Sequence, residues 1–323
     1  MIRYILKRIV WVLPVLLVIS LLIFTMLYFS PGDPTTILLP PDADEAQREL
    51  LRQRLGLDQP FWIQYGNYLR NIVTRFDFGM SWVTHQPVTV ELLQRFPFSV
   101  RLALLSSAVA TVFGIILGII SAVRQYTIFD NGSTVVGLVA FSMPNFWLGM
   151  LLLILFSVRL RWFPVAGVGT WLGWVLPSIT IGFSSMAHIM RMTRSSMLEV
   201  MRQDYITTAR AKGLHEYIVI WKHALGNASI PILTTIGLTF AGTMGGAIVT
   251  ERVFGIPGIG MLIVDAINDR NFPVVQGVVL LTALAFCLVN LLVDIVYAFV
   301  DPRIKTQYMR TKKAKVIAKE PAK

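Results

Sequence analysis

Six long apolar segments, five of them without a charged side chain, constrain the fold of this chain more than any other feature of its sequence. Segments of this length cross the ~30 Å hydrocarbon core of a bilayer as helices. A membrane β-strand would instead alternate polar and apolar residues over about ten positions. We therefore predict an all-α integral membrane protein with six transmembrane helices. These cover residues 9–30, 102–123, 132–158, 171–190, 228–250 and 277–300, the last containing one acid, Asp294.

The overall composition agrees with a membrane location. Only 15% of the 323 residues are charged, whereas soluble domains carry about a quarter. The first apolar segment lacks a small-residue cleavage site and is longer than a secretory signal, so we expect it to be retained. Cys287 is the only cysteine and lies in the sixth segment, which excludes an intrachain disulfide and a paired-cysteine metal site.

The distribution of basic residues predicts the orientation. Of the 29 Lys and Arg residues, 18 fall in residues 1–8, the second loop, residues 191–227 and residues 301–323, all on one side of the predicted membrane. Basic loops stay preferentially in the cytoplasm, so we expect both termini there. The net charge of +11 then lies next to anionic membrane lipid and does not indicate nucleic-acid binding.

The first outside loop, residues 31–100, is long enough to form a small helical cap. Asp42 and Glu45 resemble a capping pair for a helix over residues 45–55, and Gly56 lies where a helix-ending glycine is expected. A second helix is predicted from Pro60, with one apolar stripe that must lie on membrane or protein. The stripe consists of Phe61, Tyr65, Leu69 and Ile72. The cap is either a docking surface or a cover without a partner.

A second outside loop, residues 251–276, begins with a segment that favours a tight irregular turn. It contains Phe254, Pro257 and the glycines 255, 258 and 260, which preclude a regular helix. A short helix is predicted after it, over residues 261–267. Irregular backbone near a bilayer survives where protein or a water-filled cavity satisfies it, so this segment either flanks the external end of a pathway or is a plain turn.

The sequence lacks the motifs of several enzyme classes. No Gly-x-x-x-x-Gly-Lys-Ser/Thr occurs, so any use of ATP through a P-loop must come from a partner. No His-Glu-x-x-His occurs, and the four histidines are scattered, which argues against a metal site. We therefore expect no cofactor and no enzymatic activity in this chain.

Two polar residues lie within the sixth span. Asp294 follows Asn290 by one helical turn, so both share a face. An intramembrane acid is a candidate site for a proton-coupled carrier. Asp294 also lies close to the end of its span, where it can reach the cytoplasmic interface or cap a neighbouring helix.

The cytoplasmic loop of residues 191–227 is long enough to fold. Asp204 is predicted to be the N-cap of a helix over residues 205–212, which Gly213 ends. A second helix is expected from about residue 216 into the fifth span. A short amphipathic helix between two spans offers a partner something to bind, although a solvated basic loop is the alternative.

Several motifs occur in order along the chain. They are SPGDP at 30–34, LGLDQP at 55–60, FSMP at 141–144, RMTRSSM at 191–197, DYITTARAKG at 204–213, HALGN at 223–227, TERVFGIPGIG at 250–260 and DPR at 301–303. With these motifs the chain resembles the inner-membrane permease subunits of ATP-binding-cassette importers, specifically the first-permease type of the dipeptide, oligopeptide and nickel branch. The resemblance covers all but the tail after about residue 305, with a permease core over about residues 91–305.

The resemblance implies that residues 205–213 form the coupling helix, seated in a cleft of an ATPase subunit. The wider family pattern Glu-Ala-Ala-x3-Gly, aligned on Gly213, places Thr207 and Thr208 at its first two positions, where this sequence departs from it. Small side chains would permit close approach to the partner, while Arg210 and Lys212 would bond its carboxylates. The residues expected to couple are Asp204, Tyr205, Thr207, Thr208, Ala209, Arg210, Ala211, Lys212 and Gly213.

The same resemblance implies an assembly in the bacterial inner membrane. This chain would pair with a second homologous permease, bind one or two ATPase subunits, and receive substrate from a periplasmic binding protein. That protein would dock on the cap and on the second outside loop, unless this loop forms an external gate instead. The residues assigned to this docking site or gate are Glu251, Phe254, Pro257, Gly258 and Gly260.

Peptides are the expected cargo, moved by alternating access, with nickel chelates or other small solutes as the alternative. A second hypothesis is a proton-driven carrier that acts alone through Asp294. A third is a scaffold subunit of a membrane enzyme, which would tolerate charge reversal at Arg210 and Lys212.

Overall fold

The computed structural model describes residues 2–30, 34–40 and 42–300. The predicted tail, residues 301–323 with its DPR motif, and part of the SPGDP motif lie outside the described residues. Over the described residues the chain is helical, with no β-strand and one isolated bridge, Met80 to Pro87. The α-helices are α1 Ile2–Tyr28, α2 Thr35–Leu38, α3 Glu45–Leu55, α4 Phe61–Arg75, α5 Val88–Val123, α6 Ile128–Ser142, α7 Asn145–Leu152, α8 Val175–Met201, α9 Asp204–Ala211, α10 Glu216–Ile218, α11 Leu225–Gly246, α12 Ile248–Phe254, α13 Ile259–Asn268 and α14 Phe272–Val300.

Three further segments are helical with a different hydrogen-bond spacing. Leu153–Arg159 (η1) and Val219–Ala224 (η3) are π-helical, and Trp171–Trp174 (η2) is a 3₁₀-helix. Each continues directly into or out of an α-helix, so η1 extends α7, η2 leads into α8 and η3 leads into α11.

Five helices are long and apolar enough to cross a membrane, in agreement with five of the six predicted spans. They are Arg8–Tyr28, Val88–Val123, Trp171–Met201, Glu216–Gly245 and Phe272–Ile295.

The third span, predicted as one helix over residues 132–158, is instead broken into α6 and α7–η1, which are bent by 103°. The break follows from Pro144, which lacks an N–H and forces Met143 into an extended conformation (φ −82°, ψ 124°).

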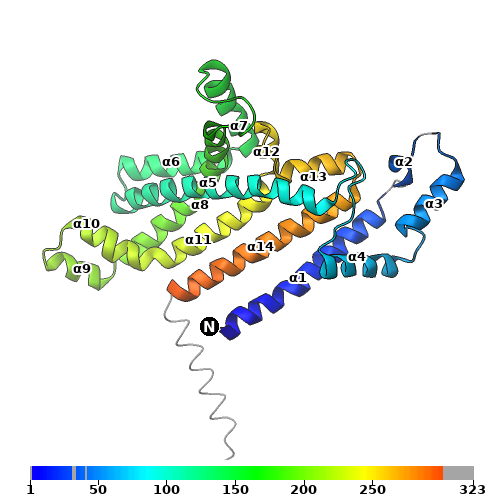
Figure 1. Cartoon of the computed structure of the whole chain (residues 1–323). Coiled ribbons are helices and arrows are strands. Elements are labelled where there is room, and N and C mark those ends of the chain that lie inside the picture. The colour runs from blue at the N-terminus through cyan, green and yellow to red at the C-terminus, as the bar shows by residue number, and fades with distance from the viewer. Residues whose placement is uncertain (1, 31–33, 41, 301–323) are drawn as a thin grey trace, which may run out of the picture.

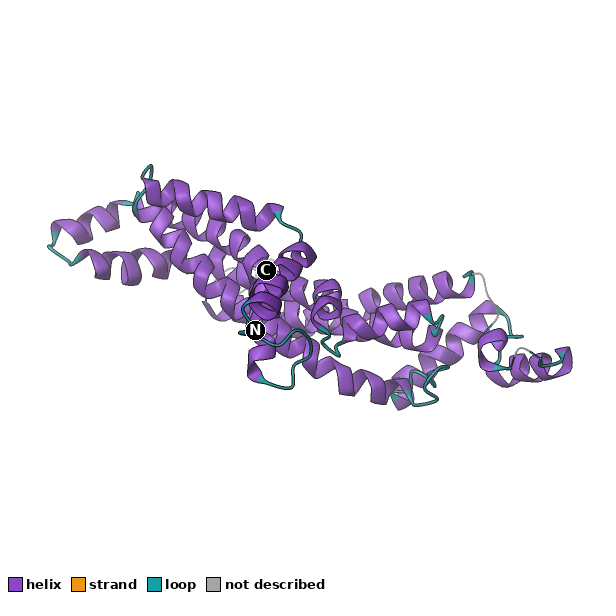
Figure 2. Ribbon diagram, turned by 90° about the horizontal axis from the view of Figure 1, so that it is seen from above, coloured by secondary structure: helices purple, strands orange, loops and turns teal. Residues whose placement is uncertain are grey.

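The long helices form an elongated bundle (Figures 1 and 2). In Figure 1, α5, α8, α11 and α14 run side by side, and α1 lies along α14. Helices α9 and α10 lie at one end of the bundle and α2, α3 and α4 at the other. The segment α7–η1 leaves the bundle sideways. We refer to the two ends as the α9 end and the cap end.

The closest helix pair, α5 and α8, is in contact through glycines. A Cβ at Gly118 would lie 2.5 Å from the Cβ of Thr193, and one at Gly114 would lie 2.8 Å from the Cβ of Ile189. No side chain fits there, so the two backbones approach as closely as in other small-residue membrane contacts. These contacts hold α5 and α8 close together.

The cap agrees with its predicted helices and differs in one capping residue. Helix α3 covers Glu45–Leu55 as predicted, and Gly56 ends it in the left-handed conformation (φ 67°). Its N-cap is Asp44, whose carboxylate accepts the Gln47 N–H at 2.8 Å, and not Asp42. Asp44 directly precedes the first turn, and only there can a short side chain reach these N–H groups.

The predicted apolar stripe of α4 packs on α1. The rings of Phe61 and Tyr65 each lie 5.4 Å from that of Phe24, and the Tyr65 hydroxyl lies 2.9 Å from the Ser20 hydroxyl. The cap therefore rests on protein through this stripe.

Candidate coupling helix and external gate

Helix α9 is a separate short helix between α8 and η3, with an end that depends on glycine. Gly213 has a φ of 75°, and its N–H donates to Arg210 O at 2.9 Å while the Leu214 N–H donates to Ala209 O at 3.3 Å. This is the double hydrogen bond of a Schellman motif. The predicted helix end at Gly213 is therefore present in the structure.

The start of α9 differs from the prediction. The N-cap is Gln203, without a side-chain capping bond, and Asp204 is the first helical residue. The reason is the backbone: Gln203 adopts the extended conformation of a cap (ψ 147°) and Asp204 is already helical. Asp204 keeps a favourable position, because a carboxylate in the first turn faces the positive end of the helix dipole.

Two side chains of α9 anchor it to the bundle. Ile206 is fully buried and Ala209 is only 7% exposed. They belong to an apolar cluster, which we call the α9 anchor, that joins the ends of α5, α8, η3 and α11. Its buried members are Ile119, Ala122, Met197, Ile206, Ala209, Val219, Ala224, Ala228 and Ile232. The anchor therefore packs α9 against these four elements.

The other face of α9 is exposed. It carries Tyr205, Thr207, Thr208, Arg210 and Ala211, and Lys212 and Gly213 directly after the helix are exposed as well. Ala209 faces the anchor at the i+3 position from Ile206, so its predicted close approach to a partner stays a prediction. Arg210 already has a carboxylate partner in its own chain, since its Nη2 lies 2.6 Å from Glu216 Oε1.

At the cap end, α12 and α13 form a helix–turn–helix unit, which we call the α12–α13 unit. Gly255 ends α12 in the left-handed conformation (φ 61°), and α13 begins at Ile259, two residues earlier than the predicted residue 261. The irregular turn thus covers only residues 255–258. The first N–H groups of α13 need hydrogen-bond acceptors. The N-cap residue, Gly258, has no side chain that could accept from them.

Ser99 of α5 and Glu251 of α12 supply these acceptors. The Ile259 N–H donates to Ser99 Oγ at 2.8 Å, and the Met261 N–H donates to Glu251 Oε2 at 3.1 Å. Ser99 Oγ in turn donates to Glu251 Oε1 at 2.6 Å. Glu251 is 1% exposed, and burial raises the pKa of its carboxyl above the ordinary value of 4.5, against the hydrogen bonds that lower it.

The predicted docking or gate residues hold the α12–α13 unit together from within. Glu251, Phe254, Gly258 and Gly260 are buried and Pro257 is half-buried. Four of these residues are therefore covered by the chain itself in this conformation, and the docking of a protein on them stays a prediction. Their role as part of an external gate stays a prediction.

The α12–α13 unit also contacts the broken span. The Gly167 N–H donates to Phe254 O at 2.9 Å, and a Cβ at Gly149 of α7 would lie 3.1 Å from Phe254 Cε2. Movement of α7 would therefore displace Phe254 and, with it, the end of α12.

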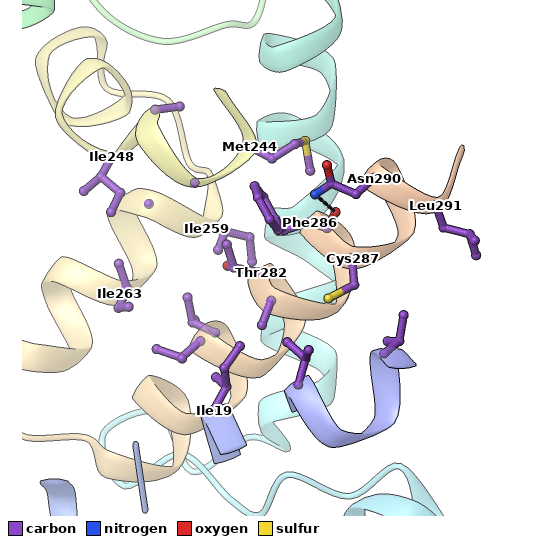
Figure 3. A pocket seen from close by; sticks show the side chains of 18 of the residues that line it. Ile19, Met244, Ile248, Ile259, Ile263, Thr282, Phe286, Cys287, Asn290 and Leu291 are labelled. Carbon is purple, nitrogen blue, oxygen red and sulfur yellow. Dashed lines mark hydrogen bonds between the residues drawn. The ribbon is translucent and has the colours of Figure 1, made fainter. Parts of the chain in front are cut away.

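A cavity of about 630 Å³ lies between α1, α14 and the α12–α13 unit. Figure 3 shows Ile259 and Ile263 of α13 facing it together with Thr282 and Phe286 of α14. Glu251 and Asp294 both line this cavity.

The two polar residues predicted to act together in the sixth span have separate partners. Asp294 Oδ2 lies 2.7 Å from Arg8 Nη1 of α1, and Asn290 Nδ2 donates to Phe286 O of its own helix at 2.9 Å. Across the residues described, no group of three His, Cys, Asp or Glu side chains could hold a metal ion.

Two polar contacts were missed by the sequence analysis. Ser99 carries no signal, because a serine in an apolar helix is common and its partner is 152 residues away. The ion pair between Asp130 and Arg194 was also missed, although Arg194 belongs to the RMTRSSM motif. Its signal was Asp130, an acid that lies just before the third predicted span.

Comparison with known families decides the class of protein. The family described as "Binding-protein-dependent transport system inner membrane component" matches residues 114–306, and the N-terminal part of such membrane components matches residues 1–103. The chain belongs to this family. It is thus an ABC importer permease of the peptide and nickel branch, as its motifs predicted, and a multi-pass inner-membrane protein.

Relatives of known function support this assignment. The permease is 43% identical over 305 residues to the glutathione transport system permease protein GsiC of Escherichia coli K12, covering 94% of this chain and 99% of that protein. GsiC of Shigella flexneri is 42% identical over the same length.

The fold agrees with solved structures. The inward-facing methionine ABC transporter MetNI matches with a TM-score of 0.54 at 16% identity, covering 66% of the permease and 97% of that chain. An amino acid ABC transporter matches with a TM-score of 0.52 at 11% identity, covering 65% and 94%. At such identities the likeness concerns the fold alone. Membership of a binding-protein-dependent family implies ATPase and substrate-binding partners for the permease.

Proposed function

We propose that the permease imports peptides from the periplasm to the cytoplasm, with α9 as the coupling helix that receives the work of ATP hydrolysis from a partner subunit. The observation that carries this proposal is the construction of α9. It is anchored through Ile206 and Ala209 to the ends of four other elements, and its opposite face is exposed. Peptide cargo is supported by the glutathione permeases at 43% identity, since glutathione is a small peptide.

Rigid attachment allows α9 to drive alternating access. When two ATPase subunits close on ATP and reopen after hydrolysis, a docked α9 moves with them and displaces α8 and α11 through the α9 anchor. Both termini then lie in the cytoplasm, as the positive-inside rule predicts. The α12–α13 unit would be the external gate of the pathway.

The rest of the assembly follows from the same proposal. A second, similar permease would pair with this chain, and substrate would pass along the interface between them. The periplasmic binding protein would dock on the cap, whose exposed residues include Trp62, Ile63 and Val73 of α4.

The first experiment is recovery of the tagged permease in mild detergent with identification of its partners. We expect a second permease and one or two P-loop ATPases. Ala211→Glu places a charge on the exposed face of α9 and should release the ATPases without lowering the unfolding temperature. Recovery of the permease alone, still transporting in liposomes without ATP, would contradict the importer and favour a carrier that uses Asp294.

Cargo is tested separately with the reconstituted complex. Uptake of radiolabelled glutathione and of a dipeptide is compared with uptake of a nickel chelate, each with the cognate binding protein present. Uptake of nickel without peptide would replace peptide import by metal import within the same transport mechanism.

A further inference from the structure

An ion pair between a buried carboxylate and a half-buried guanidinium joins α6 to α8 near the α9 end of the bundle. Arg194 of α8 donates two hydrogen bonds to Asp130 of α6, from Nε to Oδ1 at 2.9 Å and from Nη2 to Oδ2 at 3.0 Å. Asp130 is 3% exposed. A two-point contact between guanidinium and carboxylate fixes orientation as well as distance, so it sets the position of the first turn of α6 on α8.

The same carboxylate holds the end of α5 and the loop that follows it. Ser121 Oγ of α5 donates to Asp130 Oδ1 and accepts from Arg194 Nε at 2.9 Å. The Tyr126 N–H donates to Asp130 Oδ2 at 3.0 Å, and Tyr126 has the left-handed φ of 62° that a tyrosine rarely adopts. Asp130 thus joins α5, the α5–α6 loop and α8 at one point.

This contact connects α6 to α8, a connection that the α9 anchor does not make. The described residues of the anchor come from α5, α8, α9, η3 and α11, and none comes from α6. Further along, α6 meets α8 where a Cβ at Gly137 would overlap the terminal methyl of Met190. A flexible apolar side chain permits sliding there, whereas the ion pair at Asp130 does not.

We propose that Asp130 and Arg194 are positioning residues that make α6 move together with α8 when the coupling helix is displaced. The bent segment α6–α7 then carries the movement to Phe254 of α12, which contacts Gly149 of α7. The ion pair thereby links the ATPase side of the permease to the α12–α13 unit. This inference rests on the proposed function, because it takes α9 as the site that the ATPase moves.

A distance measurement, which needs no substrate, tests whether α6 moves together with α8. The complex of the permease with its partner subunits is purified with Cys287→Ser and spin labels at Val136→Cys of α6 and Glu199→Cys of α8. Distances are measured by electron paramagnetic resonance without nucleotide and with ATP trapped by vanadate. We expect one narrow distribution with the same mean in both states. Asp130→Asn should broaden the distribution and shift its mean between the states, and Ser133→Ala, a buried hydroxyl of α6, should not.

Unchanged distributions in Asp130→Asn would overturn the proposal. Transport in proteoliposomes gives the second test, as uptake of radiolabelled glutathione per ATP hydrolysed. Asp130→Asn and Arg194→Gln should lower this ratio about tenfold, while the ATPases still co-purify and hydrolyse ATP. Arg194→Lys keeps the charge and loses the second hydrogen bond, so its ratio should be intermediate.

These experiments also distinguish a purely structural role of the ion pair from an error in the proposed cargo. Proportional loss of uptake, ATP hydrolysis and bound ATPases in Asp130→Asn would show that the pair only maintains the fold, which overturns the positioning role. A wild-type complex that hydrolyses ATP without taking up glutathione would contradict the proposed cargo, and the spin-label distances would still decide the role of Asp130.

Discussion

Ser99 of α5 and Glu251 of α12 are joined by a hydrogen bond of 2.6 Å, although they lie 152 residues apart in the chain. Together they accept the first N–H groups of α13. The N-cap of α13 is Gly258, which has no capping side chain. Side chains of two other helices, α5 and α12, cap α13 instead. This arrangement locks α5, α12 and α13 into one unit around a buried carboxylate.

Loss of this carboxylate should destabilise the permease. Glu251→Ala leaves the Ser99 hydroxyl and the Met261 N–H without their acceptor in a buried site, which costs roughly 1–3 kcal/mol. The thermal unfolding midpoint of the detergent-purified complex should fall by several degrees. A midpoint equal to that of the wild type would show that water replaces the carboxylate without cost.

Stability should also depend on pH through Glu251. Because burial raises the pKa of this carboxyl above 4.5, the folded state holds the proton more tightly than the unfolded state does. The contribution of Glu251 is therefore fully present below pH 4.5 and is lost as pH rises through the raised pKa. The difference in unfolding midpoint between wild type and Glu251→Gln should become less favourable to the wild type as pH rises above the ordinary pKa of 4.5. A difference independent of pH would contradict the raised pKa.

Two glycines of the α12–α13 unit should not tolerate alanine. A Cβ at Gly258 would overlap the Glu251 carboxylate, and one at Gly260 would lie 2.6 Å from the Cα of Ile248. Either substitution should lower the unfolding midpoint and reduce peptide uptake. Gly66→Ala of α4 is the matched control, since nothing lies within 4 Å of its Cβ, and it should be neutral or stabilising by up to about 1 kcal/mol.

The two alanines of α9 should behave differently when changed to glutamate. Ala211→Glu should release the ATPases and leave the unfolding midpoint unchanged, because Ala211 is exposed. Ala209→Glu should lower the midpoint, because a charge would enter the α9 anchor, where Ala209 is 7% exposed. Co-purification together with thermal unfolding separates the two effects. Equal behaviour of both variants would argue against the exposed face as the docking surface.

Charge changes around α9 provide a further test. Glu216→Gln removes an exposed ion pair with Arg210, which should cost less than about 1 kcal/mol and leave ATPase recovery intact. Lys212→Glu should reduce recovery by repelling carboxylates of the partner. Full recovery and full uptake with Lys212→Glu would show that Lys212 takes no part in docking, whereas full recovery of partners without any uptake in the wild type would favour a scaffold role.

Asp294→Asn distinguishes the importer from a carrier. Asp294 pairs with Arg8 at 2.7 Å, and in the importer it contributes to packing of α1 on α14. ATP-dependent uptake should therefore stay within about twofold of the wild type. Abolished uptake with normal ATP hydrolysis would instead assign a transport role to this carboxylate.

Several features of the chain could be predicted from sequence because they depend on local chemistry. Five spans follow from uninterrupted apolar residues. The helix of the cap and the end of α9 follow from Gly56 and Gly213, whose positive φ values are the ones that glycine adopts most easily. Ordered motifs indicated the family before any contact was known.

Predictions from local chemistry were wrong about the shape of the third span and about two helix N-caps. Pro144 was visible as a proline within an apolar segment, but the angle of the break depends on how α7 packs on α8 and α12. Asp204 and Asp42 were both assigned as caps from residue type, whereas the cap position depends on which residue first becomes helical. When a helix begins one or two residues away from the predicted position, a different residue becomes its N-cap.

The sequence by itself determined that this chain is helical, spans a membrane and carries the motifs of an importer permease, because each of these rests on residue type and spacing along one segment. Only the tertiary structure decided which face of α9 is free, that Glu251 is buried beside Ser99, and that Asp130 is held by Arg194. Arg194 lies 64 residues from Asp130, and Glu251 lies 152 residues from Ser99, which is about 18 and about 42 turns of helix at about 3.6 residues per turn. No periodicity of one segment encodes such a pairing, since it arises when separate helices pack together.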